Sequence, residues 1–157
     1  VLLYGITNRL PNHPQNFVLP FAEIDKKINE IEAKTIASQL RNFWDNCSYF
    51  LYKTKRGYHF FGLNAISEKD YHYGLISWLS KICRWHAGLS IAKGYSTLRQ
   101  SKKSKKDNFK LIDYFIHSDK EISLSHFAFL ALKFDIDIEK MKFKARDYGI
   151  EVVGYKK

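Results

Sequence analysis

The chain has 157 residues and carries 26 Lys and Arg against 16 Asp and Glu, which gives a net charge of +10. This length is typical of one domain with its own hydrophobic core, and a hydrophobic fraction of 45% excludes disorder as the main state. The two cysteines, Cys47 and Cys83, are too few for a disulfide scaffold or a thiolate zinc site. The excess of positive charge favours an anionic partner, of which nucleic acid is the commonest.

The hydrophobic patterning predicts alternating strands and helices. In chain order we expect a strand at 17–24, a helix at 26–46, strands at 48–53 and 58–63, a helix at 67–85, strands at 89–98 and 109–116, helices at 124–134 and 138–148, and a strand at 150–155. Pro20 is expected to split the first strand into two pieces or to place it at an edge. Asp25 and Ser67 are the expected N-caps of the first two helices. This order predicts a mixed α/β fold with an antiparallel component.

A pair of acids ends the first predicted strand. Glu23 and Asp25 are two residues apart, so on a strand their side chains lie on one face and can ligate one divalent cation. The simpler alternative is that Asp25 caps the helix and that Glu23 is an exposed strand residue. Farther along the chain, Asp113 stands among apolar residues of a predicted strand, where a carboxylate needs a partner, a metal or solvent.

Residues that suit phosphate binding follow the acids. His59 comes two residues after the glycine of a predicted turn, and on the face of the acids it can hold a phosphate oxygen. Arg99 ends a predicted strand, where a guanidinium suits bidentate contact with phosphate. A run of cations follows at Lys102, Lys103, Lys105, Lys106 and Lys110. Such a run is typical either of a solvated loop or of a loop that contacts phosphates.

The order of these motifs resembles the archaeo-eukaryotic primase superfamily, which includes compact primase–polymerase domains of archaeal viruses and plasmids. The likeness covers residues 17–115: an acid-x-acid strand, a Gly-x-His strand, a basic segment and a hydrophobic-Asp strand. It implies an α+β fold with a central, largely antiparallel sheet flanked by helices. It also implies one nucleotidyltransferase-like domain over 1–157, with the motifs in a core at 17–116, and an intracellular setting such as a virus-infected cell.

The resemblance further implies metal-dependent nucleotidyl transfer in DNA replication, with Mg²⁺ or Mn²⁺ as cofactor and with DNA or RNA and nucleoside triphosphates as partners. The implied roles are metal binding by Glu23, Asp25 and Asp113, triphosphate binding by His59, Arg99 and Lys102, and nucleic-acid contact by Arg56, Lys103, Lys105 and Lys106. The sequence departs from the family at Glu23, where Asp is more usual. The long stretch 60–112 between the second and third motifs leaves Asp107 and Asp119 as rival third acids.

Two other functions fit the same residues. A metal-dependent nuclease uses such carboxylates to activate water, with His59, His86 or Lys53 as base or phosphate ligand. A non-catalytic module binds nucleic acid through the lysines and through aromatic residues such as Tyr58 or Tyr95, while the acids are structural.

Two structural expectations follow from these assignments. A shared active site predicts that Glu23, Asp25, His59 and Asp113 converge on an open face of the sheet. No membrane-spanning helix is expected, because charged residues interrupt the most apolar window, 71–92.

Overall fold

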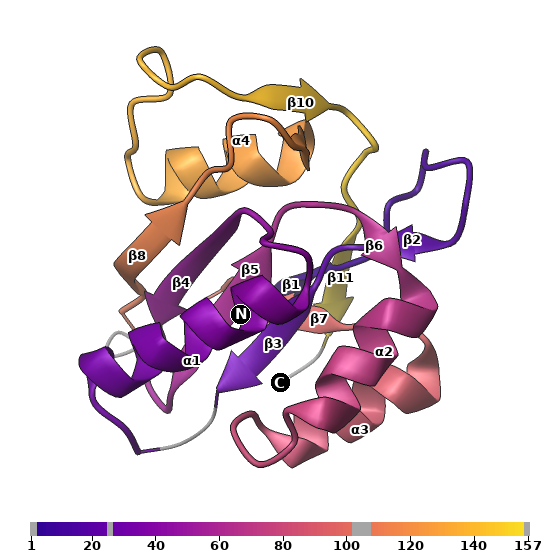
Figure 1. Cartoon of the computed structure of the whole chain (residues 1–157), viewed down its shortest axis with the longest axis vertical. Helices are drawn as coiled ribbons and strands as arrows, with labels where there is room; N and C mark the ends of the chain where they lie inside the picture. Colours follow the sequence, from indigo (N-terminus) through magenta and orange to yellow (C-terminus); the bar gives the residue numbers. More distant parts are fainter. Residues whose placement is uncertain (1–2, 25–26, 102–107, 156–157) are drawn as a thin grey trace.

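The structure is a computed structural model that describes residues 3–24, 27–101 and 108–155. Its elements (Figure 1) are β1 (Leu3–Thr7), β2 (Phe17–Val18), β3 (Phe21–Ile24), α1 (Glu30–Phe43), β4 (Tyr49–Lys53), β5 (Tyr58–Gly62), β6 (Ile66–Ser67), α2 (Glu68–Ser77), α3 (Arg84–Lys93), β7 (Thr97–Arg99), β8 (Lys110–Phe115), β9 (Glu121–Ser123), α4 (Leu124–Lys133), β10 (Lys144–Arg146) and β11 (Val152–Tyr155). The mixed α+β fold with antiparallel sheets that the sequence predicts is confirmed.

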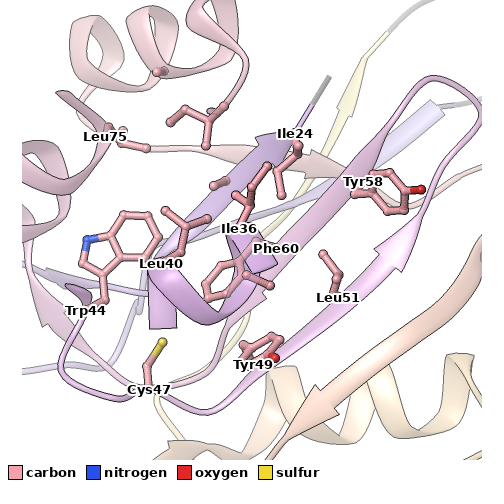
Figure 2. Close-up of a cluster of buried hydrophobic side chains, with 14 of the residues drawn as sticks. Ile24, Ile36, Leu40, Trp44, Cys47, Tyr49, Leu51, Tyr58, Phe60 and Leu75 are labelled. Carbon is pink, nitrogen blue, oxygen red and sulfur yellow. The ribbon is translucent and has the colours of Figure 1, made fainter. Parts of the chain in front are cut away.

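A four-stranded antiparallel sheet in the order β3-β5-β4-β8 forms the centre of the fold. One side of this sheet, here called the α1 face, carries Leu51 and Phe60 and packs against α1, α2 and α3 (Figure 2). The other side, here called the α4 face, carries Phe21 and Tyr52 and packs against α4 and against β1 and β7. The strands β11-β1-β7 form a second antiparallel sheet. The central sheet is therefore covered on both sides.

Helix α1 begins one turn later than the sequence predicts. Its N-cap is Asn29, whose side-chain oxygen accepts a hydrogen bond of 2.8 Å from the backbone N–H of Glu32. Glu30 and Glu32 place negative charge in the first turn, where the helix dipole favours it. The expected cap, Asp25, lies outside the described residues, and its assignment as the cap of α1 is wrong.

Three elements predicted after residue 66 differ from the structure. The helix predicted at 67–85 ends earlier, as α2 at Ser77, and α3 begins at Arg84. The strand predicted at 89–98, with an interruption near Gly94, is wrong as far as Lys93, because α3 continues to that residue and ends at Gly94, whose φ is 81°. Only its end is a strand, β7. The helix predicted at 138–148 is also wrong. There, β10 forms a parallel ladder with β9, so the backbone hydrogen-bonds between segments and not within a helix. No helix in the described part of the chain is long and apolar enough to cross a membrane.

Candidate phosphate and nucleic-acid site

The pairing of β3, β5 and β4 brings together two of the predicted site residues. Glu23 lies directly opposite His59, and His59 lies directly opposite Tyr52. Directly opposite residues of antiparallel strands point to the same side of the sheet. Glu23, Tyr52 and His59 therefore lie side by side on the α4 face.

Asp113 lies on the other side of the sheet, so its predicted convergence with Glu23 and His59 is wrong. It is directly opposite Leu51, which belongs to the α1 face, whereas Leu111 is directly opposite Tyr52. In a regular strand, residues 111 and 113 point to the same side, but the register shifts between these two pairs. Ile112 is the extra residue of this β-bulge, and it turns Asp113 to the α1 face.

The surroundings of Asp113 fit a structural role. Its Oδ2 lies 3.5 Å from the hydroxyl of Tyr49, and its Oδ1 accepts a hydrogen bond of 2.9 Å from the backbone N–H of Tyr114. Burial and then the charge of Asp113 raise the pKa of Tyr49 to about 12. Because Glu23 and Asp113 lie on opposite faces, the predicted three-acid set does not fit one metal centre.

The α4 face around His59 is also not the open face that the sequence predicts. Tyr52 is fully buried and His59 is 5% exposed, because β1, β7 and α4 cover this side of the sheet. Glu23, Arg99 and Lys133 are partly exposed and lie at the rim. The site is therefore a buried polar cluster with charged residues at its edge.

A chain of hydrogen bonds runs through this cluster. The Tyr52 hydroxyl lies 3.2 Å from Nδ1 of His59 and accepts a hydrogen bond of 2.9 Å from Nε2 of Gln100. Lys133, at the end of α4, donates to Oε1 of Gln100 at 2.6 Å. Lys133 also lies 3.8 Å from the ring centre of Phe109. Sequence motifs missed Gln100 and Lys133, since only the folded chain brings them to Tyr52.

The electrostatics of the cluster keep His59 neutral. Burial lowers the pKa of His59 well below its usual value, and the positive charges of Lys133 and Arg99 lower it further. Burial also raises the pKa of Tyr52, so its hydroxyl keeps its proton. The guanidinium of Arg99 lies 5.5 Å from the Phe109 ring centre.

A second group of cations lies at the end of the sheet that carries the β4–β5 turn. Lys53, Lys55 and Arg56 are exposed there, and Lys53 is directly opposite the exposed Lys110 of β8. Like charges directly opposite each other destabilise a sheet. Lys110 forms an ion pair of 3.3 Å with Glu30, whereas the other three have no ion pair with any described residue. We call these four residues the basic edge.

Several other predicted residues lie away from this site or beyond the described ranges. Asp119 lies in an exposed turn at the opposite end of β8 from Lys110. Tyr58 is buried on the α1 face, and its hydroxyl donates to the Ile28 carbonyl at 3.2 Å. His86 lies on α3, with Nε2 2.8 Å from the Ser96 hydroxyl. The predicted residues outside the described ranges are Asp25, Lys102, Lys103, Lys105, Lys106 and Asp107.

A pocket of about 300 Å³ lies elsewhere, between residues 9–18, the start of α2 and Gly94. At its wall Arg9 forms an ion pair of 2.5 Å with Glu151 and stacks on Tyr95 at 3.9 Å from the ring centre. Tyr95 is therefore engaged by an arginine of the same chain and lies outside the His59 cluster.

Among the described residues, no three His, Cys, Asp or Glu side chains are grouped so as to hold a metal ion. In comparisons with protein-family models, curated proteins and solved structures, the chain has no match.

Proposed function

We propose that this protein binds nucleic acid, and that the basic edge contacts the phosphate backbone. The observation that carries the proposal is the exposure of Lys53, Lys55 and Arg56 at one end of the sheet without an ion pair to any described residue. An anion that lies along this end relieves the repulsion between Lys53 and Lys110. Neutralising phosphates releases counterions, which is the main source of affinity in this kind of binding.

The arrangement of the neighbouring residues supports the same function. Lys53 follows Tyr52 directly in β4, so its side chain points to the α1 face, whereas Arg99 and Lys133 add positive charge near His59 on the α4 face. Cations therefore lie on both sides of the central sheet. In the sequence, four lysines at 102–106 lie between Arg99 and Lys110. Both groups of cations therefore suit one polyanion that passes from the end of the sheet toward the α4 face.

The proposal is tested by the salt dependence of binding to a fluorescein-labelled single-stranded DNA oligonucleotide, followed by fluorescence anisotropy. The double variant Lys55→Gln/Arg56→Gln is compared with Lys142→Gln/Lys144→Gln. The control pair is also exposed and loses the same charge, but lies near β10, away from the β4–β5 turn (Figure 1).

We expect the first double variant to bind more weakly and to reduce the slope of log K against log [salt] by roughly 1.4, which is about 0.7 for each lost contact with a single strand. The control should keep the slope of the unmodified protein. Equal slopes in the two variants would show that only net charge matters and would refute the basic edge as the binding surface.

Metal-dependent nucleotidyl transfer is a second candidate, favoured by the placement of Glu23 directly opposite His59 on one face. Asp113 has no part in it, because this residue lies on the α1 face. The test is extension of an end-labelled primer on a single-stranded template with nucleoside triphosphates and Mg²⁺ or Mn²⁺. We expect Glu23→Gln to abolish extension and Asp113→Asn to retain it. Metal-dependent shortening of the label would identify a nuclease, and an unchanged label would refute both activities.

A further inference from the structure

The strongest unassigned feature is the row of hydrogen bonds that joins Lys133, Gln100, Tyr52 and His59. We propose that Lys133, Gln100 and Tyr52 are positioning residues that hold His59 as a neutral imidazole with its proton on Nε2, and that this N–H donates to a phosphate oxygen. The placement of the proton rests on the geometry alone. The identity of the acceptor rests on the proposed binding of nucleic acid.

The first step is the orientation of the Gln100 side-chain amide. A lysine ammonium has three donors and no acceptor, so the atom of Gln100 that lies 2.6 Å from Nζ of Lys133 is its carbonyl oxygen. The amide nitrogen is therefore the atom that faces Tyr52 at 2.9 Å. Gln100 is 3% exposed, so water has little access to compete with either bond.

The second step is the direction of the Tyr52 hydroxyl. This oxygen accepts the hydrogen bond from Gln100, so its own single proton is available for His59 Nδ1 at 3.2 Å. Nδ1 then acts as an acceptor and carries no hydrogen. In a neutral imidazole one nitrogen is the donor and the other the acceptor, so the hydrogen of His59 lies on Nε2.

The third step concerns the partner of that N–H. The hydrogen bond between the His59 ring and Tyr52 uses Nδ1, which leaves Nε2 for a ligand, and the side chain as a whole is 5% exposed. Nε2 of His59 is not among the fully buried polar atoms that lack a partner in the described part of the chain, so a ligand that approaches the cluster from outside can reach it. Arg99 and Lys133 both lie near enough for their charges to act on His59, and together they outweigh the single carboxylate of Glu23 beside it, so the ligand suited to this position is an anion. A neutral donor beside two cations fits a phosphate oxygen.

The tautomer is measured directly by long-range ¹H–¹⁵N NMR correlations of the imidazole ring in the ligand-free protein, with His59 assigned from a His59→Asn variant. We expect the unmodified protein to show the Nε2–H form. Nδ1–H as the main form would overturn the proposal, whatever the protein binds.

Gln100→Glu is the decisive variant because it keeps the shape of the side chain and removes its donor. The carboxylate accepts from both Lys133 and the Tyr52 hydroxyl, so the tyrosine oxygen must accept from His59 and the imidazole proton must move to Nδ1. The matched control is Gln39→Glu on the exposed side of α1, which adds the same charge and should leave the tautomer unchanged. If the His59 tautomer does not change in Gln100→Glu, the row of hydrogen bonds from Lys133 to His59, here called the relay, does not set the position of the proton.

Two further measurements separate the relay from folding and from function. Lys133→Met should give a mixture of tautomers and Lys133→Arg should restore the Nε2–H form, because arginine also only donates. Titration with inorganic pyrophosphate should shift the Nε2–H signal, and Gln100→Glu should weaken this binding by roughly fivefold or more. If the tautomers are as expected but the Nε2–H signal does not respond to pyrophosphate, the relay is upheld and the proposal that His59 donates to a phosphate oxygen is refuted.

Discussion

Lowering the pH from 7 to 5 is expected to remove about 4 kcal/mol from the free energy of unfolding, through two buried histidines alone. His86 is 9% exposed and His126 is fully buried. Burial is the main cause that lowers the pKa of each to about 4, from an ordinary value of 6.5. A lowered pKa in the folded state means that the unfolded chain takes up the proton first. Their contribution is therefore present above pH 6.5 and is lost as the pH falls toward 4.

The magnitude follows from these pKa values. A group with a pKa of about 4 when folded and 6.5 when unfolded loses about 1.8 kcal/mol of stabilisation between pH 7 and pH 5, because each unit of pKa difference corresponds to about 1.4 kcal/mol. Two such groups lose nearly 4 kcal/mol, and His59 acts in the same direction. A domain typically has a free energy of unfolding of about 5–15 kcal/mol, so mild acid removes a large share of it.

The assay is urea unfolding at fixed pH values between 7 and 5, followed by circular dichroism. His126→Asn should reduce the loss over this range to about half, because one of the two protonations is removed. His13→Gln, which replaces a partly exposed histidine at the mouth of the pocket, is the control and should keep the full loss. A free energy of unfolding that is constant from pH 7 to pH 5 would refute the reasoning.

Two predictions concern the scaffold, both measured by urea unfolding at neutral pH. Gly62→Ala should destabilise the protein by about 1–3 kcal/mol, because the new Cβ would lie 2.7 Å from the Pro20 carbonyl oxygen. The control is Gly88→Ala inside α3, where the new Cβ meets nothing within 4 Å, and this variant should be neutral or stabilising. Equal losses of stability in the two variants would contradict this account. Asn29→Ala should cost about 1 kcal/mol by removing the cap of α1, and full retention of stability would show that the cap contributes nothing.

Local patterns were sufficient to predict α1, β4 and β5, although not α2 and α3, which pack on the same face. The apolar spacing from Ile36 to Leu40 matches the buried side of α1, and the runs 48–53 and 58–63 match β4 and β5 closely. The proline between β2 and β3 splits the strand as expected. These features depend on neighbours in sequence, which is why they are readable without the fold.

The candidate site was predictable only in part, because its geometry depends on contacts between distant segments. The predicted strands contain Glu23 and His59, and the register of β3 with β5, which was not predicted, sets the two residues directly opposite each other. Gln100 lies 48 residues from Tyr52 and 33 from Lys133, so no local pattern links them. The covering of the α4 face by β1, β7 and α4 is likewise a property of the assembled layers.

Because of its bulge, β8 has one residue more than the segment of β4 with which it pairs. Lys110 and Leu111 stay opposite Lys53 and Tyr52, and Asp113 stays opposite Leu51, with Ile112 between them. Deleting Ile112 would leave each of these pairs opposite the same partner, so a deletion at this position restores a regular ladder. A sequence alignment of β8 with a strand that has no bulge therefore needs a gap at Ile112, so that Asp113 is assigned to the correct face of the sheet.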